Sequence, residues 1–397
     1  MHVAIVLNTS WNLYNFRRGL IDALLEEEHT VTLIAPEDEH SALLRKLGYN
    51  LVTVRMDRRG IHPGRDLAYL RELYRVYRRI RPAVVLHFTV KPNIYGTVAA
   101  HALGIRVVNT VSGLGTVFLK KGAVSWMAQQ LYRLTFRWAD QVLFHNPDDY
   151  QLFVERGLVL AQQARVVPGS GVNVQRFAPV DMAPADGQPF TFLVIARLLI
   201  DKGVVEYAEA AHLLRQRGVQ ARFQLLGARD PQHRRGISDA TVDGWIEEGL
   251  IDYLGTTDDV RPFIARADAV VLPSYREGLP RTLLEAASMQ KPLVATDAPG
   301  CRHVVTDGHN GLLCRARDAA DLADALYRLQ QMALTERQQM GKRGRALVTQ
   351  RFSEEYVIKQ YLSYCRGMIN PHSGSAIDRA ATVTNNHHHY ERTTSPS

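Results

Sequence analysis

The sequence is poor in cysteine and has no long apolar run, and each absence excludes a class of protein. Its 397 residues include three cysteines, at positions 301, 314 and 365, whose spacing fits no metal site. We therefore expect reduced thiols, as in a cytosolic protein. No stretch reaches the roughly 18 consecutive apolar residues that a membrane-spanning helix needs. The start, residues 1–7, lacks a basic leader and a cleavage site, so it predicts a first strand, not a signal peptide.

Two further absences concern motifs. No Gly-x-Gly-x-x-Gly follows the first strand, which disfavours a dehydrogenase. No recognised nucleic-acid-binding motif is present either. A hydrophobic content of 46% and a charged content of 22% are typical of a globular protein, and the length predicts two domains.

Positive charge is abundant, and it is concentrated in one segment. The net charge is +8, and residues 55–82 hold nine arginines against three acidic residues. Residues 66–80 have helical periodicity, with one apolar side and one basic side. The apolar side comprises Leu67, Leu70, Leu73, Tyr74 and Tyr77, and the basic stripe comprises Arg71, Arg75, Arg78 and Arg79. Such a stripe can face anionic lipid, nucleic acid or only water.

Strand-like and helix-like segments alternate along the chain. Strands are predicted at 3–7, 31–35, 84–88, 107–110, 142–144 and 165–167, and helices at 19–25, 66–80, 95–102 and 126–138. After a break the alternation resumes, with strands at 190–196, 222–226, 268–272 and 292–296 and helices at 204–216, 282–289 and within 336–368. This alternation predicts an α/β fold in which parallel sheets are covered on both faces.

The break marks a domain boundary. Residues 168–189 are rich in proline and glycine and have little periodicity, as expected of a linker. We therefore divide the chain into a first domain (1–170), a linker (171–189), a second domain (190–352), a terminal helix (353–369) and a tail (370–397). The tail is dominated by Ser, Thr, Asn and His, which predicts disorder.

Two carboxylates eight positions apart stand out in Glu277-Gly-Leu-Pro-Arg-Thr-Leu-Leu-Glu285. A buried strand precedes them, and Pro280 suits the first position of a helix. The loop carboxylate could meet one end of a ligand and the helical one the other end, with the helix N-terminus facing an anion between them. A nucleoside diphosphate sugar has that layout. The alternative is an ordinary strand–loop–helix unit with two solvated glutamates.

Two basic residues follow the first strand of the second domain. Arg197 would lie at the carboxyl end of that strand and Lys202 in the loop before the next helix. Ligands bind open α/β sheets at these strand ends. The pair could neutralise a diphosphate without a metal ion. A surface arginine and lysine without a ligand is the alternative.

Taken together, these motifs resemble the donor site of family 4 retaining glycosyltransferases. Arg197-x4-Lys202, Glu277-x7-Glu285, Pro-Gly-Ser-Gly-Val-Asn at 168–173 and Gly308-x-Asn-Gly-Leu-Leu carry the resemblance, which spans about residues 2–365. It implies a GT-B fold, with two Rossmann-like domains facing a cleft and a final helix that returns to the first domain. The nucleotide sugar would bind mainly to the second domain and the acceptor mainly to the first, without a metal or other cofactor.

The resemblance also assigns roles to donor-site residues. Arg197 and Lys202 would hold the diphosphate, Glu277 would face the donor sugar and Glu285 would accept the ribose hydroxyls. The remaining positions would line the sugar, phosphate or base: Gly278, Leu279, Pro280, Thr282, Leu283, Gly227 and Tyr253.

In the first domain, candidate acceptor or cleft residues follow predicted strands. They are Asn12, Asn15, Arg17, His87, Lys91, Asn93, Ser112 and Gly113. For His87 a structural role and a site role are equally open, and His145 is a similar case. Many relatives carry a histidine near the position of Ser112. This chain does not, so Ser112, Thr110 or the backbone of 113–115 would take its place.

The segment 87–118 narrows the resemblance to bacterial enzymes that extend undecaprenyl-diphosphate-linked sugars with N-acetylgalactosamine or a similar hexose. This implies a peripheral protein on the cytoplasmic face of the plasma membrane, which would give the arginine stripe a role at anionic lipid. Trp126, Leu131, Phe136 and Trp138, near Lys120 and Lys121, could add an interfacial surface or could simply pack in a helix.

We expect retaining, metal-independent transfer from a UDP-sugar to a lipid-linked saccharide, with no nucleic acid as partner. The alternatives are a GDP-sugar or a soluble acceptor, a sugar-nucleotide epimerase, and a non-catalytic binding protein of membrane surfaces.

Overall fold

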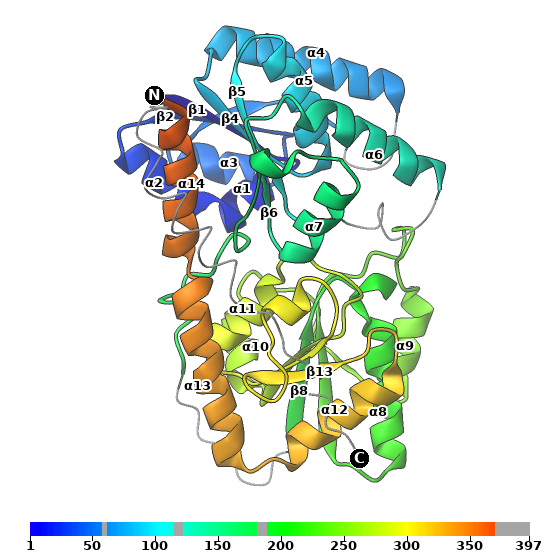
Figure 1. Cartoon of the computed structure of the whole chain (residues 1–397). Coiled ribbons are helices and arrows are strands. Elements are labelled where there is room, and N and C mark those ends of the chain that lie inside the picture. The colour runs from blue at the N-terminus through cyan, green and yellow to red at the C-terminus, as the bar shows by residue number, and fades with distance from the viewer. Residues whose placement is uncertain (58–61, 115–121, 181–188, 370–397) are drawn as a thin grey trace, which may run out of the picture.

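The computed structural model describes residues 1–57, 62–114, 122–180 and 189–369, which form two α/β halves placed end to end (Figure 1). In the described part of the first half, seven strands form one parallel sheet in the order β3-β2-β1-β4-β5-β6-β7. The strands are β1 (His2–Val6), β2 (Thr30–Ala35), β3 (Asn50–Thr53), β4 (Val84–Phe88), β5 (Arg106–Val111), β6 (Gln141–Phe144) and β7 (Ala164–Val166). The strand order reverses between β1 and β4, which is where ligands bind in such sheets.

The described part of the second half has a six-stranded parallel sheet in the order β10-β9-β8-β11-β12-β13. The strands are β8 (Phe190–Ile195), β9 (Ala221–Leu226), β10 (Asp252–Tyr253), β11 (Ala269–Leu272), β12 (Leu293–Thr296) and β13 (Gly311–Cys314). Here the order reverses between β8 and β11, so each half has its own switch point. The predicted α/β class with two Rossmann-like units is confirmed.

Helices cover both faces of each sheet. The first half contains α1 (Ser10–Phe16), α2 (Arg18–Glu26), α3 (Ser41–Lys46), α4 (Pro63–Ile80), the π-helix η1 (Pro92–Gly96), α5 (Thr97–His101), α6 (Ala123–Phe136) and α7 (Pro147–Glu155). The second contains α8 (Val204–Gln216), α9 (Asp239–Glu247), α10 (Arg261–Arg266), α11 (Arg281–Ser288), α12 (Ala319–Gln331) and α13 (Leu334–Arg351), and α14 (Glu354–Ile369) ends the described chain. None of the helices in these described segments is long and apolar enough to cross a bilayer.

Within the described residues the chain passes between the halves twice, and the two passages are hydrogen-bonded to each other. Val172 donates its N–H to the carbonyl of Phe352 (2.9 Å), and Glu354 donates its N–H to the carbonyl of Val172 (2.9 Å). Gly171 has a φ of +70°, and a Cβ there would lie 2.6 Å from the Cα of Glu354. Glycine is therefore required where the passages cross.

Helix α14 returns to the first half, as the resemblance implied. It lies beside α2 and the first sheet (Figure 1). Val357, Tyr361, Leu362, Cys365 and Met368 are buried in the same hydrophobic cluster as β1, α2 and β2. The last described element of the chain thus completes the core of the first domain.

Helix α4 differs in part from the sequence-based expectation. Its buried stripe consists of Tyr69, Leu73, Val76 and Tyr77, whereas Leu67 is 45% exposed. At 3.6 residues per turn, Leu67 points about 120° away from Leu73. The prediction that Leu67 belongs to the packed side was therefore wrong. Arg71, Arg75, Arg78 and Arg79 are all exposed, as expected of a basic stripe.

Candidate functional site

The carboxyl ends of the two sheets face each other, and the loops that follow their strands meet there. A Cβ on Gly278, after β11, would lie 1.8 Å from the carbonyl oxygen of Ser112, after β5. Gly113 has a φ of +138°, and a Cβ there would lie 3.1 Å from the backbone nitrogen of Gly278. Both glycines allow a backbone-to-backbone contact across the domain boundary. The structure thus joins residues predicted for the acceptor side and the donor side.

Lys202 and Glu277, predicted from separate motifs, form an ion pair. The Lys202 Nζ donates to Glu277 Oε1, and the two side chains are 25% and 14% exposed. Glu277 N–H donates to the carbonyl of Pro299 (2.9 Å), which fixes the loop to the segment after β12. The ammonium group and the carboxylate neutralise each other in this arrangement, so an incoming phosphate would compete for Lys202.

Glu285 lies on α11 with its carboxylate beside Arg281, which sequence reasoning missed. Arg281 Nε donates to Glu285 Oε1 (3.1 Å). Burial raises the pKa of Glu285, and the nearby Arg281 guanidinium opposes that rise. The Arg-x3-Glu spacing on one helix was the signal that could have identified this pair.

The start of α11 is tied to the end of β8. Pro280 is the N-cap of the helix, one position before the predicted place. Thr282 Oγ1 donates to the carbonyl of Ile195 (3.2 Å), just before Arg197. Leu283 is buried, and its N–H donates to the carbonyl of Pro280 (3.2 Å). The Leu283 N–H therefore already has a backbone acceptor.

The other predicted donor residues lie along the carboxyl edge of the second sheet. Arg197 is exposed there, directly after β8. A Cβ on Gly227 would lie 1.8 Å from the carbonyl oxygen of Ala196, so this glycine is required by a neighbouring strand end. Tyr253 donates its hydroxyl to the carbonyl of Gly227 (3.0 Å), and Arg229 stacks over its ring (Cζ to centroid 4.6 Å).

Helix α1, which follows β1, reaches the donor domain through Asn15. Its carbonyl accepts a hydrogen bond from Arg281 Nη1 (3.1 Å), and Arg281 Cζ lies 4.9 Å from the ring centroid of Phe16. The Asn12 side chain instead contacts the segment between β1 and α1, because its Nδ2 donates to Asn8 Oδ1 (3.0 Å). Asn12 and Asn15, predicted for a cleft loop, therefore both lie in α1, and Asn15 contacts the glutamate-bearing helix.

Arg17 is not an open cleft residue, contrary to the prediction. It is 5% exposed, and its Cζ lies 4.0 Å from the ring centroid of Phe88 and 5.6 Å from that of Tyr361. Burial lowers the pKa of Arg17. Its position between β4 and α14 indicates that it helps to dock the returning helix.

His87 is fully buried, so its prediction as a cleft residue is also wrong. The Tyr77 hydroxyl lies 2.8 Å from Nε2, and Nδ1 lies 2.9 Å from Asn109 Oδ1. These partners fit a neutral ring that donates from Nδ1 and accepts at Nε2. Burial lowers the pKa of His87 to about 4.

Lys91 and Asn93 are likewise engaged within the first domain. Lys91 Nζ donates to the buried Asp66 Oδ1 (2.6 Å), and Asn93 Nδ2 donates to the carbonyl of Thr110 (2.9 Å). Both side chains fasten the segment after β4 to its neighbours, α4 and β5. They are not presented to an acceptor as the sequence predicted.

Sequence reasoning missed a second set of contacts across the boundary, made by the start of α7. Asn146 Nδ2 donates to the carbonyl of Gly278 (2.7 Å), and Asp149 forms an ion pair with Arg276. His303 Nε2 donates to Asp148 Oδ2 (2.7 Å), and this bond lowers the pKa of Asp148. The signal was present, because Asn146, Pro147 and two acidic residues mark a helix start directly after a strand.

His145, which precedes this set, is buried and does not face an open cleft. Burial is the largest cause that lowers its pKa, to about 3. Among the interfacial candidates, Trp126 is 65% exposed whereas Phe136 is fully buried. Trp138 stacks on His101 with ring centroids 4.7 Å apart. Lys120 and Lys121 lie outside the described residues.

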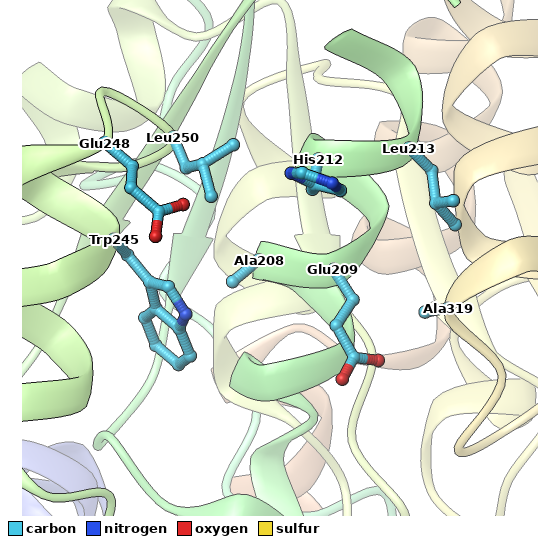
Figure 2. Close-up of a pocket in the computed structure, with 8 residues that line it drawn as sticks. All are labelled: Ala208, Glu209, His212, Leu213, Trp245, Glu248, Leu250 and Ala319. Carbon is cyan, nitrogen blue, oxygen red and sulfur yellow. The ribbon is translucent and has the colours of Figure 1, made fainter. Parts of the chain in front are cut away.

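A separate pocket lies on the outer face of the second domain between α8 and α9 (Figure 2). It is lined by Ala208, Glu209, His212, Leu213, Trp245, Glu248, Leu250 and Ala319. None of these is a predicted site residue. Within the described ranges, no group of three or more His, Cys, Asp or Glu side chains is placed to hold a metal ion.

Comparison with known proteins is consistent with this geometry. A family model described as "Glycosyl transferase 4-like" matches residues 2–146, and one described as "Glycosyl transferases group 1" matches residues 189–332, together most of the chain.

Curated relatives align over much of the chain. The chain is 28% identical over 341 residues to the N,N'-diacetylbacillosaminyl-diphospho-undecaprenol alpha-1,3-N-acetylgalactosaminyltransferase of Campylobacter jejuni. The matched region covers 82% of this chain and 88% of the relative. The chain is 24% identical over 276 residues to the UDP-Gal:alpha-D-GlcNAc-diphosphoundecaprenol alpha-1,3-galactosyltransferase of Escherichia coli (67% and 70% covered). The structure of Anabaena Alr3699/HepE in complex with UDP has the same fold, with a TM-score of 0.75, 18% identity, and coverage of 92% and 100%.

Proposed function

Because the chain belongs to the GT-B glycosyltransferases built from a 4-like and a group 1 domain, we propose that it transfers a hexose or N-acetylhexosamine from a UDP-sugar to a saccharide carried on undecaprenyl diphosphate. The observation that carries the proposal is the pairing of Lys202 with Glu277 at the edge that faces the first domain. Glu285 lies on the next helix, within the same donor motif.

The relatives support both substrates. The names of the C. jejuni and E. coli enzymes each include a diphosphate-linked undecaprenol acceptor, and the latter name also includes UDP-galactose. Each relative spans most of its own length in the match, so the likeness extends over both domains. The sugar and the linkage formed by this chain are open within that class.

In the proposed reaction the β-phosphate of the donor displaces Glu277 from Lys202. Lys202 and the exposed Arg197 then stabilise the negative charge that develops on the departing UDP, which is the role of preorganised cations in transfer reactions. Glu277, released from the lysine, accepts hydrogen bonds from the donor sugar, and Glu285 accepts those of the ribose. The acceptor hydroxyl attacks the anomeric carbon from the face of the departing phosphate, whose oxygen takes the proton. The configuration is retained, and no metal ion takes part.

The acceptor would be reached from the inner surface of the plasma membrane. Arg71, Arg75, Arg78 and Arg79 are exposed on α4, at the end of the molecule remote from the second domain (Figure 1). Basic side chains near an anionic bilayer contribute roughly 1 kcal/mol each to binding. We propose that α4 holds the first domain against anionic lipid, close to lipid-linked saccharides.

Two alternatives remain distinct from this proposal. The same site could use a GDP-sugar or a soluble acceptor, since neither Lys202 nor Glu285 selects a base or an acceptor. A non-catalytic membrane-binding protein is the alternative from another class, favoured only by the arginine stripe. A panel of UDP- and GDP-sugars, each tested with undecaprenyl-diphosphate saccharides and with the same saccharides free of lipid, separates the three, with product mass and anomeric configuration as readouts. The absence of a product from every donor would refute the proposed function.

The donor site is tested by Lys202→Ala and Glu285→Ala. Removal of the lysine leaves the departing diphosphate with Arg197 as its one proposed cation, and removal of the glutamate leaves the ribose without its acceptor. We expect kcat/KM to fall by roughly 10²–10³-fold in each variant. Exposed Lys359 and Glu247, changed to Ala, are matched controls that should keep wild-type rates. Near-wild-type transfer by Lys202→Ala and Glu285→Ala would contradict the assignment.

A further inference from the structure

The loop that bears Glu277 is held from the first domain by the start of α7. Three contacts form this domain latch: Asn146 with Gly278, Asp149 with Arg276, and Asp148 with His303. Arg276, Glu277 and Gly278 are consecutive, so the first two contacts flank the glutamate on both sides. The latch therefore fixes the backbone from which the Glu277 carboxylate projects.

Asn146 divides its amide between two functions. Its Oδ1 accepts the N–H of Asp149 (2.8 Å), which caps α7. Its Nδ2 donates to the carbonyl of Gly278 (2.7 Å), with the carbonyl of Glu277 at 3.4 Å. The side chain is fully buried. Capping needs only the oxygen, and any of several residues can supply it. The Nδ2 group serves the loop of the other domain, and it also donates to Asp149 Oδ2 (3.1 Å), the next residue of the latch.

Asp149 and Arg276 form the second contact, an ion pair largely shielded from solvent. The Asp149 side chain is fully buried and that of Arg276 is 19% exposed. Removing one partner of a buried pair leaves an uncompensated charge, which is far more disruptive than removing both. Burial raises the pKa of Asp149, and Arg276 opposes that rise. The pair thus couples the position of Arg276, next to Glu277, to the first domain.

We propose that Asn146 and Asp149 are positioning residues: the acceptor-side domain holds the glutamate loop in the register that places Glu277 at the donor sugar. The inference rests on the proposed function for the role of Glu277. In the second domain the loop is tied back through Glu277 N–H and Pro299, and its carbonyl side is bonded to Asn146. A displacement of about 1 Å at a reacting group can cost roughly 10²-fold in rate.

The first test separates positioning from capping. Asn146→Ser keeps a favoured N-cap oxygen but lacks the amide donor. Asn146→Asp keeps the cap but turns a carboxylate towards two carbonyls and the Asp149 carboxylate. We expect kcat to fall about 10–100-fold with Asn146→Ser and further with Asn146→Asp, with the donor KM changed less. Ser238→Ala removes the cap of α9, remote from the boundary, and should leave kcat unchanged. A kcat for Asn146→Ser within twofold of wild type would overturn the proposal.

The second test is a double-mutant cycle of Asp149→Asn and Arg276→Gln. If the pair positions the loop, the double variant should lose no more kcat than the worse single variant. Losses that multiply would show independent roles and would count against the latch.

A third measurement does not depend on activity. Amide hydrogen exchange of the peptide spanning 276–283 should be faster in Asn146→Ser and Asp149→Asn than in wild type, while β9 peptides are unchanged. Unaltered exchange at 276–283 would refute the latch even in an active enzyme. If the wild-type protein transfers no sugar, the proposed function fails, and the exchange result still judges the latch.

Discussion

At the scale of single residues, the charged side chains of the candidate site form ion pairs with one another. Glu277 is bonded by Lys202 and Glu285 by Arg281, so both carboxylates already have a cationic partner. Sequence spacing could predict the glutamates because a strand, a loop and a helix start place them locally. It could not predict that His87 is buried, because its partners Tyr77 and Asn109 come from α4 and β5.

The buried His87 predicts a pH dependence of stability. Its pKa is lowered to about 4 in the folded protein, so the unfolded chain, with an ordinary value near 6.5, takes up the proton first. The stability is therefore complete above pH 6.5 and is lost as the pH falls from 6.5 towards 4, by about 3 kcal/mol. Denaturant unfolding of wild type and His87→Gln between pH 4 and 7 measures this. Parallel pH profiles of the two proteins would show that His87 is not responsible.

At the scale of elements, the strands missed from the sequence share one property. β3, β10 and β13 are all edge strands of their sheets, whereas every central strand was predicted. A central strand is buried on both faces and is a continuous apolar run, which β10, with Asp252 and Tyr253, is not. The contacts of α7 with the second domain were missed for a related reason. The sequence at a helix start indicates the capping residue, but it does not indicate which residues of another domain pack against it.

Helix α4 gives a prediction at this scale. Changing Arg71, Arg75, Arg78 and Arg79 to Glu should weaken binding to anionic vesicles at least tenfold, because four attractive charges become repulsive. Vesicle co-sedimentation measures the effect. The matched control reverses four exposed basic residues on α12 and α13, Arg328, Lys342, Arg343 and Arg351, with the same change of net charge. Equal weakening by both variants would mean that α4 is not the contacting surface.

At the scale of the whole molecule, the candidate site lies where the two domains meet. The described contacts across the boundary include Gly278 with Ser112, Arg281 with Asn15 and the domain latch. The two-domain fold followed from the sequence, because each half has its own alternation of strands and helices. The contacts between the halves could not be predicted from the sequence, because they depend on how the surfaces of two folded domains fit together.

Gly278→Ala tests this dependence. The new Cβ would lie 1.8 Å from the carbonyl oxygen of Ser112, so the facing loops must separate. We expect transfer to fall by about 10²-fold or more while both domains stay folded. Steady-state rates and small-angle scattering measure the two effects. Gly244→Ala in α9, where a Cβ meets nothing within 4 Å, is the control. Wild-type rates for Gly278→Ala would contradict the close contact.

The return of α14 has a consequence for protein synthesis. The ribosome finishes the described strands of the first domain at Val166. Helix α14, which shares a hydrophobic cluster with Val3, Ile5 and Leu24, is made only after the second domain. At 5–20 residues per second, roughly ten seconds or more separate the two events. During that interval the nascent first domain presents an apolar surface that a chaperone can occupy. A premature stop codon near position 353 would therefore damage the first domain, although every described strand of both sheets has been made by then.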